Sequence, residues 1–284
     1  MPQPGTAAVR WRRDLAAWAI PEPILAAAPE DPYRFPGELF RRRAARASAG
    51  VDPPTPTTER ALEALPEGGT VLDVGCGSGA TSLPLAGHVA TITGVDESAR
   101  MLAAFSSAAA EAGVASATVE GRWPDVAADV DGADVVCSGH VLYNVPELGP
   151  FALALDGHAR RRVVVELTER HPWAWMGDLW IRFHGLERPA GPSADDAVAV
   201  LREAGLTPER EDRVSRAGGG GGFAERSDAV ALVRRRLCLG ADRDGEIAEA
   251  LGDRLVRDAD GLWSAGPERH VTVTLWWTPS GPTG

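Results

Sequence analysis

A glycine-rich turn that follows a short apolar run with an acid in it is the segment of this chain best suited to chemistry. Its three glycines stand at alternate positions: Gly75, Gly77 and Gly79. Glycines let the backbone turn sharply and approach a bound molecule more closely than any Cβ would allow. A helix after the turn, expected over about 80–87, would point free N–H groups at that molecule. Residues 70–75 are thus predicted to form a buried strand that ends in a ligand-cradling turn.

A second carboxylate, Asp96, closes the next apolar run about twenty residues after the glycines. At that spacing, a carboxylate at the tip of the second strand can accept hydrogen bonds from both ribose hydroxyls of a nucleoside held over the first. Dinucleotide dehydrogenases share this logic, but their fingerprint is G-x-G-x-x-G. Here the loop is G-x-G-x-G, and Asp73 stands two residues before its first glycine.

These two segments resemble motif I and the second motif of the class I S-adenosylmethionine (SAM)-dependent methyltransferases. The resemblance covers about residues 57–278 and implies SAM as cofactor, with S-adenosylhomocysteine (SAH) as product. In that family the glycine loop holds the amino-acid end of SAM and the second acid holds its ribose. The implied cofactor contacts are Asp73, Gly75, Cys76, Gly77, Asp96, Glu97 and Met101. Cys76 is expected to lie in the loop without a chemical part.

The third motif departs from the commonest family pattern. Many relatives have Gly-Asp after the third strand, and the aspartate accepts from the adenine amino group. Here Gly121 is followed by Arg122 and Trp123. We expect main-chain atoms of these two residues to read the adenine edge, with the Trp123 indole stacked on the ring. The structural alternative for Trp123 is a place in the core or on the surface.

The segment after the predicted fourth strand carries the candidate catalytic residue, His140. In the family this segment lies beside the methyl-bearing sulfur, which implies cofactor contacts from Ser138, Gly139 and His140. An imidazole could deprotonate a hydroxyl or amine poised to attack the methyl group. The alternative is a histidine that packs against the cofactor or caps the loop. Tyr143 and Asn144 are expected to line the substrate pocket or to join the next helix.

Metal chemistry is not predicted. Glu166 and Glu169 are a weak signal for a magnesium site, and His171 and His184 lack a convincing third ligand. Methyl transfer needs no metal in principle, because SAM carries both the activated methyl and its leaving group.

The composition excludes several classes of function. The 284 residues include no lysine, so neither a Walker-type P-loop nor a pyridoxal Schiff base can form. A net charge of −11 argues against a nucleic-acid partner. No apolar run approaches the roughly 18–20 residues needed to span a bilayer, and the first residues lack a signal-peptide pattern. We therefore expect a cytoplasmic protein without a membrane partner.

Alternating strands and helices must position these residues. The fold class predicted is α/β, because strands and helices alternate along the chain in the pattern of a mostly parallel sheet with seven strands. The family resemblance implies a Rossmann-like sheet whose last strand is antiparallel and lies beside the fifth. The strands are predicted near residues 70–75, 90–95, 115–120, 133–138, 162–168, 207–215 and 270–277. The helices between and after them are predicted near residues 79–88, 98–112, 146–159, 193–204, 225–237 and 244–251.

Two further segments are predicted to cover the site. Residues 1–56 form an N-terminal helical cap segment, with helices expected over 9–20 and 37–49, and Thr57 or Thr58 caps the next helix. Residues 57–278 form the methyltransferase domain, with an aromatic-rich insert at about 170–192 as a lid. Tyr33 and Trp175 are the candidate substrate contacts on these segments. The alternative is that such rings fill a core between lid and sheet.

The sequence therefore predicts a SAM-dependent methyltransferase that acts on an O, N or C atom of a small molecule, as a monomer or homodimer. Two alternatives stay open. One is a methyltransferase that acts on RNA or protein, and the other is a SAM-binding protein that has lost catalysis.

Overall fold

The computed structural model describes residues 5–34, 54–216, 222–267 and 269–281. These residues include a seven-stranded sheet of order β3-β2-β1-β4-β5-β9-β6. Its strands are β1 (Gly69–Val74), β2 (Val89–Asp96), β3 (Ala115–Glu120), β4 (Ala133–Gly139), β5 (Ala159–Thr168), β6 (Glu209–Arg216) and β9 (Arg269–Trp277). The first five are parallel, and β9 runs antiparallel between β5 and β6. This confirms the predicted sheet, including the place of the last strand.

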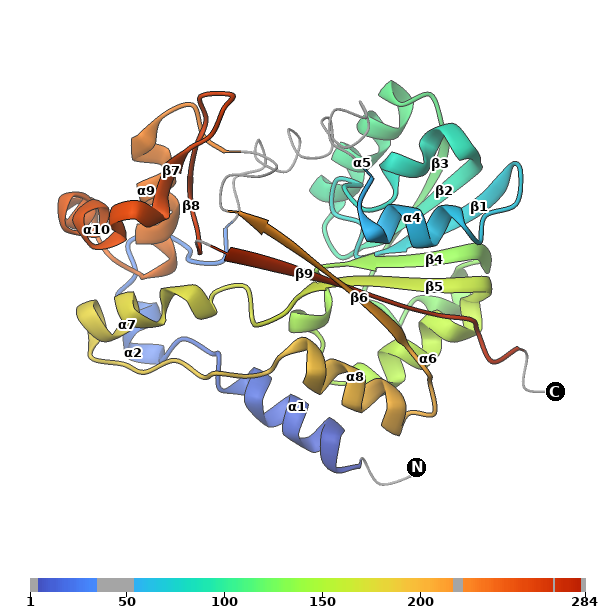
Figure 1. Cartoon of the computed structure of the whole chain (residues 1–284), viewed down its shortest axis with the longest axis horizontal. Coiled ribbons are helices and arrows are strands. Elements are labelled where there is room, and N and C mark those ends of the chain that lie inside the picture. The colour runs from blue at the N-terminus through green and yellow to red at the C-terminus, as the bar shows by residue number, and fades with distance from the viewer. Residues whose placement is uncertain (1–4, 35–53, 217–221, 268, 282–284) are drawn as a thin grey trace.

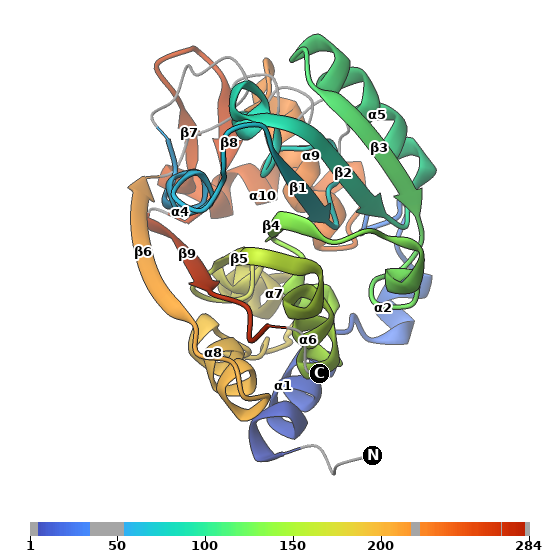
Figure 2. The same ribbon diagram turned by 90° about the vertical axis from the view of Figure 1, so that its right-hand side faces the viewer.

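Continuous apolar runs explain why β1, β4 and β5 occupy the middle of the sheet. Leu72, Val136 and Val164 are fully buried, because helices cover both faces at these strands. One face carries α1 (Thr6–Ala16), α6 (Leu148–His158) and α8 (Ala194–Glu203). The other carries α4 (Pro56–Leu62), α5 (Ala99–Glu111) and the 3₁₀ segment η1 (Leu83–His88), as Figures 1 and 2 show. The site residues at the strand ends thus rest on a rigid, two-sided core.

Two local predictions need correction. The helix expected directly after the glycine turn is instead a turn followed by the short η1. Pro84 explains this, because it has no N–H to donate to Ala80 and so breaks the first turn of an α-helix there. The cap of α4 is Thr55, whose hydroxyl accepts from the Thr58 N–H, and not Thr57 or Thr58.

Of the predicted N-terminal cap segment, the structure describes residues 5–34 and 54–56. Helix α1 is bounded by Thr6 and Ala16, and its Trp11 is fully buried, with Nε1 donating to the carbonyl of Val145 at 2.8 Å. It therefore covers the α6–α8 layer. A short helix, α2 (Glu22–Ala26), follows α1. The helix expected over 37–49 lies outside the described residues.

The aromatic insert belongs to a second packed unit. Its η4 (Ala174–Met176) and α7 (Gly177–His184) share an apolar core with α9 (Arg226–Arg236), α10 (Asp244–Leu251) and the hairpin of β7 (Leu255–Arg257) and β8 (Trp263–Ala265). Figure 1 shows this unit beside the sheet, at the end toward which β6 and β9 extend. The hairpin was not predicted. The remaining 3₁₀ segments are η2 (Ala127–Asp129), η3 (Leu142–Asn144), η5 (Ala241–Arg243) and η6 (Gly252–Arg254). Among the helices described, none is long and apolar enough to cross a bilayer.

Candidate functional site

The turn after β1 is locked between its neighbours. The N–H groups of Gly75 and Cys76 both donate to the carbonyl of Val95 on β2, at 2.8 and 3.0 Å. Gly75 has φ +71°, and a Cβ there would lie 2.3 Å from Cγ2 of Val141, in the loop after β4. Only glycine fits this position, as predicted from its spacing.

Gly77 presents the open side of the same turn. Its φ is +53°, and a Cβ there would meet no described protein atom within 4 Å. Its N–H donates to Oδ2 of Asp96 at 2.9 Å, while Oδ1 of Asp96 accepts from the Ser98 N–H at 2.9 Å. Each carboxylate oxygen has a second lone pair, so Asp96 can still accept from ribose hydroxyls. Turn and carboxylate together form an open cradle at the tips of β1 and β2.

Asp73 lies beneath this cradle with one oxygen unused. The side chain is fully buried, and Oδ2 accepts from the Ser82 hydroxyl at 2.6 Å. Oδ1 is buried and has no hydrogen-bond partner. Burial raises the pKa of Asp73 to about 7; the Ser82 hydrogen bond opposes the shift, and the nearby Asp96 charge adds to it. A buried carboxylate oxygen without a partner fits the ammonium group of an amino acid, which is the end of SAM expected here.

The adenine side differs from the expectation at Trp123. Its indole is 6% exposed and packs in the main core, edge-on to His158 at 4.8 Å between ring centroids. The Trp123 ring therefore lies in the core, which was the structural alternative. Only the main chain of Trp123 is left for an adenine contact. Arg122 and Glu97 are exposed and form an ion pair of 3.7 Å across the ends of β3 and β2. Met101 is half-buried in the first turn of α5.

Residues at the end of β4 and after it divide into buried supports and exposed side chains. The buried Ser138 hydroxyl donates to the carbonyl of Val74 at 2.9 Å, which ties β4 to β1. A Cβ on Gly139 would lie 2.1 Å from Oγ1 of Thr81, so this strand end abuts the turn. The Tyr143 hydroxyl donates to the Thr168 carbonyl at 2.6 Å, and burial raises its pKa well above the ordinary value. Tyr143 and Asn144 lie in η3 and not in the next helix, α6, as the second alternative had it. Tyr143 is buried and Asn144 is exposed.

The side chain of His140 is exposed to solvent and contacts Glu166 of β5. Its Nε2 lies 3.0 Å from Oε1 of Glu166, and 49% of its side chain is exposed. Burial alone would raise the pKa of Glu166. The hydrogen bond with His140 and the charge of His140 outweigh this effect, and the Thr57 hydrogen bond and the Arg213 charge add to theirs. The pKa of Glu166 therefore lies below its ordinary value. Sequence reasoning missed Glu166 and Thr57 as site residues. Gly139 pairs with Glu166 on the adjacent parallel strands β4 and β5, and this register places Glu166 beside His140.

Of the two candidate substrate contacts on the covering segments, Trp175 lies in the second unit and Tyr33 lies outside it. Tyr33 is 56% exposed in the turn after α2. Trp175 is half-buried beneath the guanidinium of Arg254, 5.9 Å from the ring centroid. Among the described residues, no hydrogen bond or ring contact joins either of them to His140. Nor do the described ranges hold a group of three or more His, Cys, Asp or Glu side chains suited to a metal.

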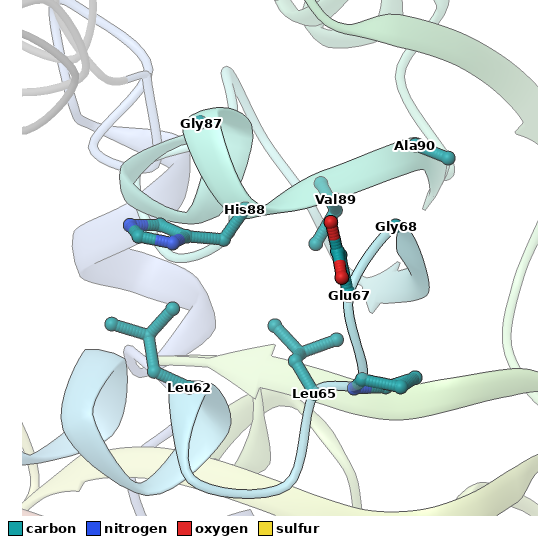
Figure 3. A pocket seen from close by; sticks show the side chains of 9 residues that line it. Leu62, Leu65, Glu67, Gly68, Gly87, His88, Val89 and Ala90 are labelled. Carbon is teal, nitrogen blue, oxygen red and sulfur yellow. The ribbon is translucent and has the colours of Figure 1, made fainter.

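A surface hollow of about 630 Å³ lies at the other end of the sheet. Leu62, Leu65, Pro66, Glu67, Gly68, Gly87, His88, Val89 and Ala90 line it, as Figure 3 shows. It opens where β1 and β2 begin, about 20 Å along β1 from the glycine turn. We assign it no part in the chemistry, because the cradle and His140 lie where these parallel strands end.

Comparisons with known proteins match this chain to a methyltransferase domain and to a shared fold. A family profile described as a methyltransferase domain matches residues 71–154. The chain is 28% identical over 180 residues to 2-heptyl-1-hydroxyquinolin-4(1H)-one methyltransferase of Mycobacteroides abscessus, a match that covers 63% of this chain and 66% of that relative. A structure from Bacillus halodurans, provisionally assigned as a methyltransferase, superposes with a TM-score of 0.52 at 13% identity. That superposition covers 78% of this chain and 96% of the other, and it shows the shared fold.

Proposed function

We propose that this chain, which belongs to the class I SAM-dependent methyltransferase family, transfers the methyl group of SAM to a small-molecule acceptor. The observation that carries the proposal is the buried, unpartnered Oδ1 of Asp73 at the end of β1, followed four residues later by the open face of Gly77. Asp73 would bind the ammonium group of SAM, the Gly75–Gly77 turn its amino-acid end, and Asp96 its ribose. SAM, when bound, supplies an activated methyl group and a neutral leaving group.

The acceptor side is proposed at His140. Its ring reaches solvent at the carboxyl end of β4, while Glu166 anchors Nε2 from below. A half-exposed imidazole can take a proton from an incoming hydroxyl or N–H group as the methyl is transferred. Positioning of the acceptor supplies the rest of the rate enhancement that the protein contributes.

Two observations favour a small acceptor over RNA. The net charge of −11 opposes a polyanion, because phosphate binding needs a positive surface. The relative from Mycobacteroides abscessus carries in its name a small hydroxylated heterocycle. A compound that presents a hydroxyl or N–H on a planar ring is therefore the class to screen first.

Calorimetric titration with SAM and with SAH tests the binding half of the proposal. We expect micromolar affinity for each from the wild-type chain, and a loss in Asp73→Ala. SAH release with hydroxylated and N–H-bearing heterocycles then tests the acceptor half, with a random RNA as the competing substrate. Folded protein that binds neither SAM nor SAH would overturn the proposal, and methylation of the RNA alone would overturn its small-molecule part.

A further inference from the structure

The contacts around His140 distinguish its two ring nitrogens, and we infer that Glu166, held in place by Thr57, positions His140 so that Nδ1 is the atom that accepts the proton of the methyl acceptor. This inference rests on the proposed methyl transfer and specifies its acceptor chemistry. Glu166 and Thr57 are positioning residues in it, because they act through His140.

The tautomer of His140 follows from the contact between its Nε2 and Glu166. The ionised carboxylate of Glu166 can only accept a hydrogen bond, so Nε2, 3.0 Å away, carries the hydrogen. In the neutral ring the lone pair is then on Nδ1. Among the described residues, Nδ1 of His140 has no hydrogen-bond partner. The basic nitrogen of the ring is therefore the one left for a substrate.

The main chain holds the ring in the same orientation. His140 has φ +59°, a left-handed conformation that is unfavourable for a non-glycine residue. Its N–H donates to the carbonyl of Glu166 at 2.7 Å, so the residue that binds the ring also fixes the backbone. Such a conformation persists where its surroundings determine it, and it clusters at functional sites.

The second oxygen of Glu166 is fixed by two other elements. Thr57 of α4 donates its hydroxyl to Oε2 at 2.5 Å, and Thr274 of β9 lies 2.8 Å from the Thr57 hydroxyl. A hydroxyl has one hydrogen, so Thr57 accepts from Thr274 while it donates to Glu166. Three elements distant in sequence thus converge on one carboxylate and hold it toward His140.

Other charged and titratable groups also face this carboxylate. Arg213 of β6 also lowers the pKa of Glu166, by less than His140 and Thr57 do. Cys137 of β4 is fully buried, and burial, Asp73 and Glu166 raise its pKa well above the ordinary value. Glu166 therefore stays ionised and Cys137 neutral.

The arrangement selects an acceptor with a removable hydrogen. An electron pair of the acceptor heteroatom forms the new bond to the methyl carbon, and the carbon–sulfur bond of SAM breaks to leave neutral SAH. The acceptor O–H or N–H bond breaks, and its proton passes to Nδ1, where Glu166 stabilises the imidazolium. Hydroxyl and N–H compounds are the predicted substrate class, and tertiary amines, which have no hydrogen to give, are excluded from it.

Histidine-selective ¹⁵N NMR of the full chain tests the tautomer without turnover. The His140 signals should show hydrogen on Nε2 and a lone pair on Nδ1, and assignment comes from the spectrum of His140→Gln. Hydrogen on Nδ1 would overturn the inference. SAM or SAH titrated into the same sample reports separately on the proposed function, because a chain that binds neither can still show the predicted tautomer.

Kinetics of Glu166→Gln test the positioning role. The amide keeps the size of Glu166 and one accepting oxygen for Nε2 of His140, but its NH2 group can only donate toward Thr57. The negative charge is lost, so imidazolium forms less readily. We expect kcat to fall roughly tenfold or more, the KM for SAM to stay unchanged, and the acid limb of the pH profile to move down by about one unit. Thr57→Val should show part of this effect and Thr57→Ser little of it. The exposed Glu111→Gln is the matched control; a pH profile of Glu166→Gln identical to that of this control would overturn the inference.

Discussion

The N–H of Gly77 donates to Oδ2 of Asp96 at 2.9 Å, and this bond joins the glycine turn after β1 to the tip of β2. One carboxylate thus supports the backbone of the turn and faces the space above it. The turn and the acid are 19 residues apart in sequence, so their contact depends on the parallel pairing of the two strands. Changes at either residue should affect the ligand more than the fold.

Asp96→Ala should weaken SAM binding by roughly 1–3 kcal/mol, because the ribose loses a charge-assisted acceptor. Asp96→Asn keeps an oxygen for the Gly77 N–H and should lose less. Calorimetric titration with SAH measures both. Equal affinities in wild type and Asp96→Ala would remove Asp96 from the cofactor site.

Gly77→Ala should reduce SAM affinity beyond its effect on stability. The new Cβ meets no described protein atom, so within the fold it adds only the strain of φ +53°, roughly 1–2 kcal/mol. In the complex it would occupy the space of the cofactor. Gly113→Ala is the matched control, since Gly113 has φ +72°, an equally open Cβ position and a place at the end of α5. If both variants bind SAH equally well, the open face of Gly77 is not the cradle.

Asp73→Asn should change how the stability of the ligand-free protein depends on pH. The pKa of Asp73 is raised from 3.8 to about 7, so between these values the folded chain holds a proton that the unfolded chain releases. The free energy of unfolding therefore falls as pH rises from about 4 to about 7, by a few kcal/mol. Asn cannot titrate, so the variant should lack this loss. Urea unfolding at pH 5 and pH 8 measures it, and equal pH dependence in both proteins would contradict the prediction.

Arg188→Ala should loosen the second unit from the sheet. Its guanidinium lies 5.1 Å from the Trp18 ring and 4.8 Å from the Trp180 ring, and it donates to the carbonyl of Trp18. His171, which follows β5, stacks on Trp18 at 3.8 Å. Losing two cation–π contacts and a charged hydrogen bond should cost about 2–4 kcal/mol of unfolding free energy.

Hydrogen exchange of α7 amides reports that loosening directly. Arg182→Ala is the control, because Arg182 is exposed and contacts the neighbouring Phe183 at 5.7 Å. It should change stability by less than about 1 kcal/mol. Exchange in α7 that rises equally in both variants would show that the Arg188 contacts do not hold the unit.

Local chemistry made the cofactor half of the candidate site predictable. Gly75 and Gly77 need left-handed backbone, and Asp96 stands at the end of an apolar strand, so residue type and spacing were enough to propose the turn and its acid. Alternating strand and helix signals likewise predicted a mostly parallel sheet, because parallel strands need crossover helices.

The acceptor half depended on contacts that sequence spacing does not reveal. Trp123 lies in the core, where its ring packs nearly perpendicular to that of His158 on α6. The aromatic insert packs with α9 and α10, because their apolar faces form one shared core. The partner of His140 was decided by strand register, which sets Glu166 beside Gly139 and brings Thr57 to the same carboxylate. The sequence alone thus determined which backbone could approach a ligand, since that is a property of single residues and their neighbours. Only the tertiary structure decided which side chains remain accessible and which nitrogen of His140 is free, since burial and hydrogen bonding depend on residues far apart in the chain.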